Sequence, residues 1–324
     1  MKISILGGGG FLGRKIATKL AKDGTLAGKP VTALTLFDIA EPPRPEAPFP
    51  VNAIGGDLVA LPDSAIPQGT DVVFHLAAVV SAQAEADYDL GRRVNIRGTD
   101  AVVDRCRALG TRPRVVFTSS VASFSANQNT TLPDNTRQIP SNSYGAQKAA
   151  AELILADASR RGFLDVVTLR LPTVIVRPGR PNKAASSFFS AIVREPLLGL
   201  DTELPVGDDF AVWVCSPRRA VDWLLHAAAM DTSQMGLDRS VDPPGISTTV
   251  AHLLQALEQV APGASSHVKR VADKTIAAIV STWPPAFEAM HARTLGFSAH
   301  EPVLDVIRAF IEDDLAATKA ERAR

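Results

Sequence analysis

The sequence contains only two cysteines and no excess of charge of either sign. Cys106 and Cys215 have no partner at metal-ligand spacing and form no C-x-x-C pair, so we interpret them as small buried hydrophobes in a reducing compartment. The 34 basic and 34 acidic residues cancel, which argues against a nucleic-acid partner and against binding to an anionic membrane. No apolar run is long enough to cross a bilayer, and no charged segment precedes the first apolar run. We therefore expect a cytoplasmic protein without a membrane partner.

Histidine clusters, internal repeats and low-complexity tracts are also absent. The six histidines are scattered without the spacing of metal ligands, so no metal is expected. What is present is the composition of an ordinary globular protein, 46% hydrophobic and 21% charged, in a chain of 324 residues. That length allows one large α/β domain with a smaller partner domain.

Short apolar runs alternate with helical stretches through the first half of the chain, which is typical of a parallel sheet wound by crossover helices. One expected helix follows the first strand, and two more cover residues 94–109 and 143–161. The expected strands cover residues 3–6, 31–37, 71–76, 114–118 and 166–171. This pattern predicts an α/β protein with a Rossmann-type doubly wound parallel sheet.

The alternation of strands and helices fades after Pro178. We therefore expect a dinucleotide-binding Rossmann domain over residues 1–177, which also receives part of 211–242. Most of residues 178–324 would form a smaller C-terminal substrate-binding domain. Two segments poor in apolar residues, 41–50 and 125–141, are predicted to be loops, the second of them near the active site.

Three glycines follow the first expected strand with the spacing Gly7-x-x-Gly10-x-x-Gly13, directly before a helix. Gly7 lets the chain turn sharply, Gly10 leaves room for a pyrophosphate at the helix N-terminus, and Gly13 lets the helix pack close to the sheet. Any tight strand-to-helix turn needs glycine, so the motif alone is a weak signal. Its position between a strand and a helix favours a dinucleotide site.

Asp38 ends the second expected strand, 25 residues beyond Gly13. A carboxylate there can accept hydrogen bonds from both ribose hydroxyls of an adenosine, and it repels a 2′-phosphate. Taken alone, an aspartate at a strand end more often starts a turn. With the glycine turn before it and no arginine directly after it, Asp38 favours NAD over NADP as the cofactor.

Tyr144 and Lys148 are four residues apart in an expected helix, so both side chains project from one face. A nearby ammonium favours the phenolate, so we expect Lys148 to lower the pKa of Tyr144 and make it a general base. A tyrosine and a lysine at this spacing are more often ordinary surface residues. Here, however, the pair follows a strand that ends in Ser119-Ser120, where a hydroxyl can orient a substrate oxygen.

From residue 1 to about residue 180 the motifs together resemble the extended short-chain dehydrogenase/reductase superfamily, which includes the NAD-dependent epimerases and dehydratases. In chain order they are Gly7-x-x-Gly10-Phe11-Leu12-Gly13, Asp57-Leu58, His75-Leu76-Ala77-Ala78, Asn95-x-x-Gly98-Thr99, Ser119-Ser120 and Tyr144-Gly145-x-x-Lys148. Leu6 departs from the threonine usual in the family, at a position that supports the turn and does not touch the chemistry.

This resemblance implies a catalytic set of Ser120, Tyr144 and Lys148. Ser120, four residues before Phe124, matches the family's serine better than Ser119 does. The cofactor-binding residues that the resemblance and the motifs imply are Gly7, Gly10, Phe11, Leu12, Gly13, Asp38, Asp57, Leu58, Ala77, Ala78, Asn95, Tyr144, Lys148, Pro172 and Val174. Within that set, Asp57 and Leu58 would flank the adenine, and Asn95 would brace the sheet near the active site.

The segments from residue 170 to about residue 230 resemble the D-erythronate dehydrogenase family more closely than the superfamily at large. The matching segments are Arg170 to Gly179, Pro181-Asn182, Ser186-Ser187-Phe188-Phe189, Arg194-Glu195-Pro196-Leu197 and Ser216-Pro217-Arg218-Arg219-Ala220-Val221. Such enzymes oxidise the C2 hydroxyl of a four-carbon sugar acid to a 2-oxo acid and form NADH. Thr173 stands where nucleotide-sugar epimerases typically have asparagine, which argues against a nucleotide-sugar substrate.

A small acid needs a receptor for its carboxylate, and arginine binds carboxylates with two parallel hydrogen bonds. Arg177 and Arg219 are the two candidates, although an arginine after a strand or near a helix start is more often part of a surface ion pair. The expected substrate-binding residues are Ser120, Tyr144, Thr173, Arg177, Asn182, Ser186 and Arg219.

The reaction that this resemblance implies is the NAD-dependent oxidation of D-erythronate to 2-oxo-D-erythronate. Tyr144 would be the general base, Ser120 would bind the same oxygen, and Lys148 would hold the nicotinamide ribose. The alternatives are a nucleotide-sugar epimerase or dehydratase that retains NAD, a uronate or other aldonate dehydrogenase, and a non-catalytic NAD-binding protein, which usually lacks one of these three residues. The superfamily resemblance also implies a homodimer formed through the helices at 94–109 and 143–161.

Overall fold

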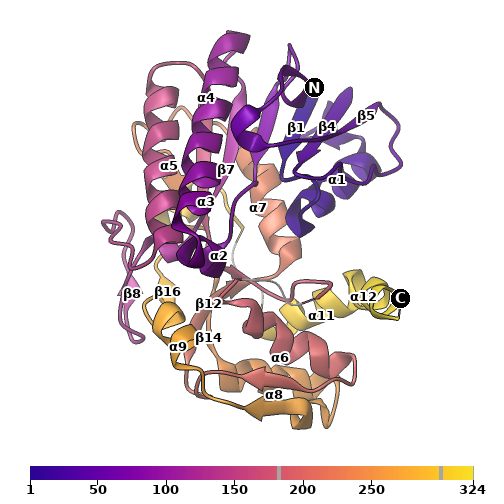
Figure 1. Cartoon of the computed structure of the whole chain (residues 1–324), viewed down its shortest axis with the longest axis vertical. Helices are drawn as coiled ribbons and strands as arrows, with labels where there is room; N and C mark the ends of the chain where they lie inside the picture. Colours follow the sequence, from indigo (N-terminus) through magenta and orange to yellow (C-terminus); the bar gives the residue numbers. More distant parts are fainter. Residues whose placement is uncertain (181–183, 299–301, 324) are drawn as a thin grey trace.

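The computed structural model describes residues 1–180, 184–298 and 302–323, which form an upper and a lower body in the view of Figure 1. The upper body is built on seven parallel strands, which confirms the predicted Rossmann-type doubly wound sheet. In spatial order they are β13 (Ser240–Val241), β9 (Asp165–Leu171), β7 (Arg114–Ser120), β6 (Val72–His75), β1 (Lys2–Leu6), β4 (Ala33–Asp38) and β5 (Val51–Gly55).

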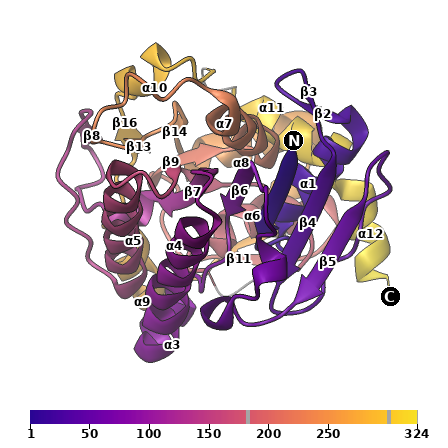
Figure 2. The ribbon, with the colours of Figure 1, turned by 90° about the horizontal axis from the view of Figure 1, so that it is seen from above.

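Helices cover both faces of this sheet (Figure 2). On one face lie α1 (Phe11–Asp23) and α7 (Pro217–Ala229), whose apolar stripes, including Ile16 and Leu224, are buried against the strands. On the other face lie α3 (Tyr88–Arg92), α4 (Gly98–Leu109) and α5 (Ser143–Arg160), with Val102 and Leu155 buried in a second core cluster. Strands covered on both sides read as nearly continuous apolar runs, which is why the sequence signal was strong.

Several element boundaries differ from the sequence-based expectation, and two of them bear on the site. The helix expected over 94–109 begins earlier, with α3, and continues through a π-helical turn over Arg93–Arg97 into α4. The strand expected over 31–37 runs as β4 over Ala33–Asp38, because its pairing begins at Ala33 opposite Lys2 of β1 and ends at Asp38 opposite Gly55 of β5. Asp38 is therefore the last residue of its strand.

The lower body packs around its own core. Its helices are α6 (Ser187–Leu197), α8 (Val250–Val260), α9 (Lys274–Val280), α11 (Val303–Asp313) and α12 (Leu315–Arg322). Its sheets pair β10 (Thr173–Val174), β12 (Ala211–Cys215) and β14 (Ile246–Thr249) in one and β11 (Thr202–Leu204) with β15 (Val268–Arg270) in another. The segment 125–141, expected as a loop, contains the short strand β8 (Thr131–Leu132), which pairs with β16 (Ala286–Phe287).

The remaining elements are small and lie at the edges. They are the hairpin β2 (Thr25–Leu26) and β3 (Lys29–Pro30), the helices α2 (Ser81–Ala86) and α10 (Met290–Thr294), and short 3-10 turns at Leu58–Ala60, Asp63–Ala65, Val121–Ser123 and Ala264–His267. Across the described parts of the chain, no helix combines the length and the apolarity needed to cross a membrane. The carboxyl ends of β1, β7 and β9 face the lower body, which is where doubly wound sheets place their ligands.

Candidate active site

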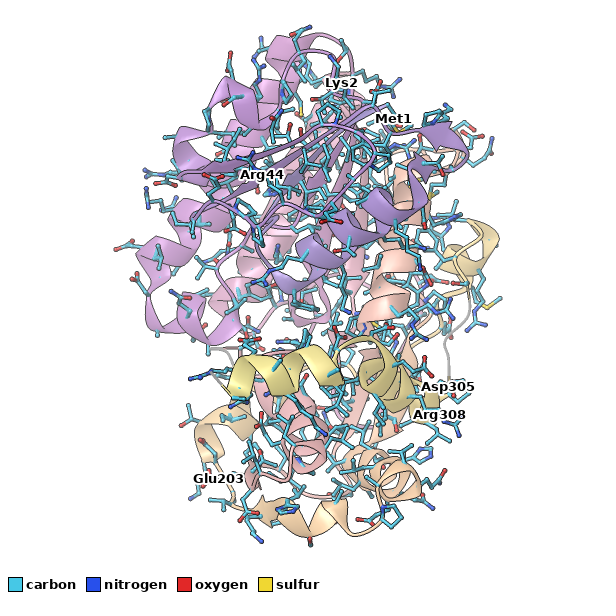
Figure 3. The ribbon with its side chains drawn as sticks, turned by 90° about the vertical axis from the view of Figure 1, so that its right-hand side faces the viewer. Met1, Lys2, Arg44, Glu203, Asp305 and Arg308 are labelled. Carbon is cyan, nitrogen blue, oxygen red and sulfur yellow. The ribbon has the colours of Figure 1, made fainter. Side chains whose placement is uncertain are left out.

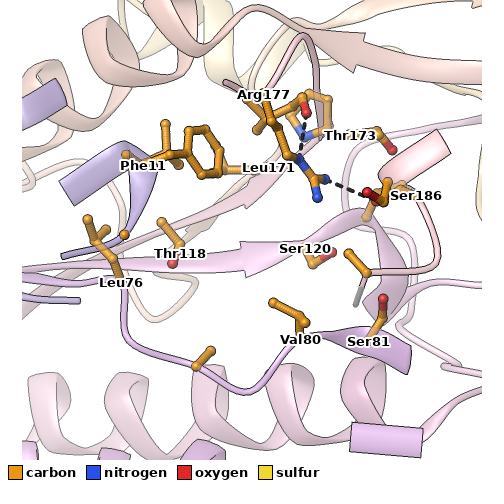
Figure 4. A pocket seen from close by; sticks show the side chains of 18 of the residues that line it. Phe11, Leu76, Val80, Ser81, Thr118, Ser120, Leu171, Thr173, Arg177 and Ser186 are labelled. Carbon is orange, nitrogen blue, oxygen red and sulfur yellow. Dashed lines mark hydrogen bonds between the residues drawn. The ribbon is translucent and has the colours of Figure 1, made fainter. Parts of the chain in front are cut away.

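A cavity of about 440 Å³ lies between the two bodies, at the carboxyl ends of the parallel strands. Its volume is within the range usual for ligand pockets. Figure 4 shows Phe11 and Leu76 at one end and Ser120, Thr173 and Ser186 toward the other. The predicted site residues that line it are Gly7, Gly10, Phe11, Leu12, Gly13, Ala78, Ser120, Tyr144, Lys148, Pro172, Thr173, Val174, Arg177 and Ser186.

The glycine turn is shaped by backbone contacts that a side chain would break. Gly7 has φ 90°, and its N–H and that of Gly8 both donate to Phe37 O, at 2.8 and 2.9 Å. A Cβ on Gly13 would lie 2.2 Å from Gly7 O, so only glycine lets α1 start this close to the sheet. A Cβ on Gly10 would meet nothing nearer than Gly7 O at 3.3 Å, and that residue faces the cavity. The first N–H groups of α1 are thus open to a pyrophosphate, as NAD requires.

Asp38 contributes a carboxylate at the edge of this turn. Its Oδ2 accepts a hydrogen bond from Gly9 N at 2.9 Å, and its Oδ1 accepts one from Ile39 N at 2.7 Å. The group is half-buried and has lone pairs left for the ribose hydroxyls of an adenosine. The turn and this acceptor together fit NAD.

We predict that Asp38→Asn raises the KM for NAD about 30-fold, because an ionised acceptor adds about 2 kcal/mol over a neutral one. Loss of the charge also removes the repulsion of a 2′-phosphate, so the preference for NAD over NADP narrows. Steady-state kinetics with both cofactors measure the change. Asp63→Asn, at a surface carboxylate whose side chain is 84% exposed, is the control and should leave both constants unchanged.

Helix α5 brings Tyr144 and Lys148 to the cavity. Asn142 caps the helix by accepting a hydrogen bond from Gly145 N at 2.8 Å. A Cβ on Gly145 would lie 1.9 Å from Ala122 O, so glycine there lets the helix start against the turn that follows Ser120. Lys148 is buried, donates to Thr118 O at 2.7 Å, and has its Nζ 5.7 Å from the centre of the Tyr144 ring.

The electrostatics of the pair differ from the expectation. Burial raises the pKa of Tyr144 to about 12, and the two opposing influences are the charge of Arg177 and a hydrogen bond with Ser120. The prediction that Lys148 lowers this pKa is therefore wrong, and Arg177 is the cation that does so. Burial also lowers the pKa of Lys148 to about 7, against the raising effect of Glu152 one turn further along α5.

The two serines at the end of β7 point to different partners. Ser119 Oγ hydrogen-bonds the buried carboxylate of Glu152, which also accepts from Arg170 Nε at 2.9 Å. Ser120 Oγ accepts from Ala122 N at 3.1 Å and interacts with Tyr144. Only Ser120 is thus linked to the tyrosine, and Ser119 belongs to a buried ionic network behind the site.

The substrate-side residues separate in the structure. Arg177 lines the cavity, where its Nε donates to Val174 O at 2.9 Å and its Nη2 to Ser186 Oγ at 3.0 Å (Figure 4). Arg219 lies elsewhere on α7, donates to Ser298 Oγ at 2.8 Å, and is not among the residues that line the cavity. Asn182 lies outside the described residues. The structure therefore brings one of the two candidate arginines to Tyr144.

Five further predicted residues lie outside the lining of the cavity. Asp38 lies at the glycine turn, where it accepts from Gly9 N. Asp57 forms an ion pair with Arg93 and caps a short turn, and Leu58 is buried beside it. Asn95 accepts from Val79 N at 2.8 Å and donates to Gln147 Oε1 at 2.7 Å, so it braces the segment after β6 against α5. Ala77 N donates to Leu6 O at 3.0 Å, beside Gly7.

Arg180 also lines the cavity, and so does a further arginine that was not predicted as a site residue from the sequence, Arg194. It is 1% exposed and paired with Glu195 inside the otherwise apolar helix α6. The adjacent opposite charges in an apolar helix were the available signal, because buried charges are rarely kept unless they are paired. Within residues 1–180, 184–298 and 302–323, no group of three or more His, Cys, Asp or Glu side chains could hold a metal ion.

Comparison with known proteins gives matches over nearly the whole chain. The profile of the NAD dependent epimerase/dehydratase family matches residues 3–214. A D-erythronate dehydrogenase of Cupriavidus necator is 45% identical over 320 residues, covering 97% of this chain and 98% of that protein. One of Haemophilus influenzae is 38% identical, covering 97% and 100%. A crystal structure described as a nucleoside-diphosphate-sugar epimerase of Agrobacterium tumefaciens is 44% identical, with a TM-score of 0.91 over 98% of this chain and 96% of that one.

Proposed function

This chain belongs to the NAD-dependent epimerase/dehydratase family, and on that premise we propose that it oxidises the C2 hydroxyl of D-erythronate to a ketone, with NAD as the acceptor. The products are 2-oxo-D-erythronate, NADH and a proton. Two relatives named D-erythronate dehydrogenase, which this chain matches over nearly their full length, support this substrate. The glycine turn and Asp38 support the cofactor.

The observation that carries the proposal is the proximity of Arg177 to Tyr144. The charge of Arg177 is close enough to lower the pKa of the phenol, and both side chains line one cavity. In a 2-hydroxy acid the carboxylate is bonded directly to the carbon that carries the reacting hydroxyl. A guanidinium that binds this carboxylate therefore brings the C2 oxygen to the tyrosine.

The side chains of the site would then act in sequence. Arg177 binds the carboxylate, with Ser186 and Thr173 beside the substrate hydroxyls. Ser120 hydrogen-bonds the C2 oxygen, and Tyr144 takes the proton from that oxygen as the C–H bond breaks. Lys148, fixed at Thr118 O, lies one helical turn from Tyr144, where it can hold the nicotinamide ribose. Bound NAD supplies the hydride acceptor.

An epimerase on the same fold is the competing function. The Agrobacterium tumefaciens relative is described as a nucleoside-diphosphate-sugar epimerase, and that description favours this second function. Thr173, buried in the cavity lining, supplies a hydroxyl where the sugar-nucleotide enzymes typically have an amide. An epimerase regenerates its NAD in each cycle and releases no NADH.

Absorbance at the NADH band tests the proposal directly. The protein is mixed with NAD and, separately, with D-erythronate, other four- to six-carbon aldonates, a uronate and UDP-glucose. Strong NADH formation with D-erythronate supports the proposal. NADH formation with only a uronate or a longer aldonate would show that the substrate is that acid and not D-erythronate. No NADH formation with any acid, together with epimerisation of UDP-glucose, would reject the proposed function.

We also propose that the enzyme is a cytoplasmic homodimer and that the lower body is its substrate-binding domain. Two exposed apolar side chains, one on α5 and one on α3, support the dimer. Leu153 on α5 is 72% exposed and lies outside the buried face of this helix. Tyr88 on the neighbouring α3 is 58% exposed. A second copy of the chain would cover such apolar groups.

A further inference from the structure

The main chain of Arg177 is held on both sides by one helix. Its N–H donates to Ser190 Oγ at 3.1 Å, and its carbonyl accepts from Arg194 Nη1 at 2.7 Å. Ser190 and Arg194 are one turn apart on α6, so they present both groups on one face. The position of the Arg177 guanidinium in the cavity therefore depends on where Arg194 is held.

Arg194 is in turn held by its neighbour Glu195. The Nε and Nη2 atoms of Arg194 lie 2.9 and 2.7 Å from Glu195 Oε1. Both residues are buried, Arg194 to 1% exposure and Glu195 to 6%. Burial lowers the pKa of Arg194, and the Glu195 carboxylate opposes that effect. A buried guanidinium that lost this carboxylate would be uncompensated and would move toward water.

Glu195 also receives a contact from the far end of the chain. Arg322 Nη2, in the last described turn of α12, lies 2.8 Å from Glu195 Oε1 and 2.9 Å from Oε2. Figure 3 shows the two yellow C-terminal helices at the junction of the upper and lower bodies. A second tie links α12 to the residues after Arg177, because Gly179 N donates to the buried Thr318 Oγ1 at 3.5 Å.

We propose that the C-terminal helix α12 positions the carboxylate receptor of the substrate site, because Arg322, Glu195 and Arg194 form a chain of contacts that fixes Arg177. We call these three residues the arginine relay. They are positioning residues, since their contacts lead to the carboxylate receptor and not to the reacting atoms. This inference rests on the proposed function, in which Arg177 binds the substrate carboxylate. Preorganised receptors bind more tightly because less ordering is lost on binding.

The test compares Arg322→Gln with Arg218→Gln. Arg218 on α7 pairs with Glu312 and Asp313, so its loss also weakens the attachment of the C-terminal segment but leaves Glu195 untouched. We expect Arg322→Gln to raise the KM for D-erythronate roughly tenfold, with kcat and the KM for NAD unchanged, because it loosens only the receptor. Arg218→Gln should leave all three constants unchanged, and Arg322→Lys, which keeps one ion pair, should recover part of the loss.

Hydrogen exchange provides a readout that does not depend on the substrate. The Arg177 N–H is protected by Ser190, so exchange over residues 174–180 should accelerate in Arg322→Gln and stay unchanged in Arg218→Gln. Unchanged KM and unchanged exchange in Arg322→Gln would overturn the relay, as would equal effects of the two variants. If the natural protein forms no NADH with any sugar acid, the proposed function fails, and the exchange result alone still accepts or rejects the relay.

Discussion

Tyr144→Phe should lose turnover by about 10³-fold, because a general base in the transition state contributes between about 10² and 10⁴. The substitution removes only the phenol oxygen and leaves a ring of the same shape in its partly buried position. The KM for NAD and the thermal stability should therefore change little. Initial rates of NADH formation at saturating D-erythronate measure the effect.

The chain provides a matched control, because Tyr88 is its only other tyrosine and is 58% exposed. Tyr88→Phe should retain full turnover.

The rate of oxidation should depend on pH in a definite direction. Burial raises the pKa of Tyr144 to about 12, so the phenol is protonated at neutral pH and oxidation should accelerate with rising pH between about pH 6 and 9. Near-natural turnover of Tyr144→Phe would remove the tyrosine from the chemistry.

Arg177→Gln should raise the KM for D-erythronate about 100-fold, since loss of a charge-assisted pair costs about 3 kcal/mol. It should also act on Tyr144, because the charge of Arg177 is the larger of the two effects that lower the pKa of the phenol. Without that charge the pKa rises further and less phenolate is present at a given pH. The rise of kcat/KM with pH should therefore shift to more alkaline pH, which a pH series of initial rates detects.

Arg219→Gln is the control for this variant, because Arg219 was the other sequence candidate for the carboxylate and lies against Ser298. It should leave the KM for D-erythronate unchanged. Arg177→Lys keeps the charge and loses the planar pair of donors, so we expect an intermediate KM and a pH profile close to the natural one. A raised KM in Arg219→Gln with none in Arg177→Gln would exchange the roles of the two arginines.

Local motifs account for what the sequence predicted well. The fold class, the family and the NAD cofactor, all predicted from motif order, are confirmed. The glycine turn and the spacing of Tyr144 and Lys148 depend only on a single turn or helix, so residue spacing determines them. The roles of the individual residues remain predictions that the variants above test.

Contacts between distant segments and the effects of burial could not be predicted from the sequence. The lowered pKa expected for Tyr144 was wrong because desolvation depends on what covers the ring, and no spacing reports that. Arg177 and Arg219 looked equivalent because the direction of each guanidinium is set by tertiary packing. The pair of Glu195 and Arg322 joins residues 127 positions apart, and no local pattern connects the two segments.

The most direct test of the proposed reaction is to identify the carbon atom of the substrate from which the hydride is removed. D-Erythronate carrying deuterium at C2 is incubated with the enzyme and NAD, and the nicotinamide product is analysed by mass spectrometry. If Tyr144, Ser120 and Arg177 act as proposed, the NADH formed carries the deuterium. The rate of NADH formation then shows a primary isotope effect when hydride transfer is the slowest step. Unlabelled NADH, or deuterium retained in the sugar product, would contradict oxidation at C2 and the geometry from which it is inferred.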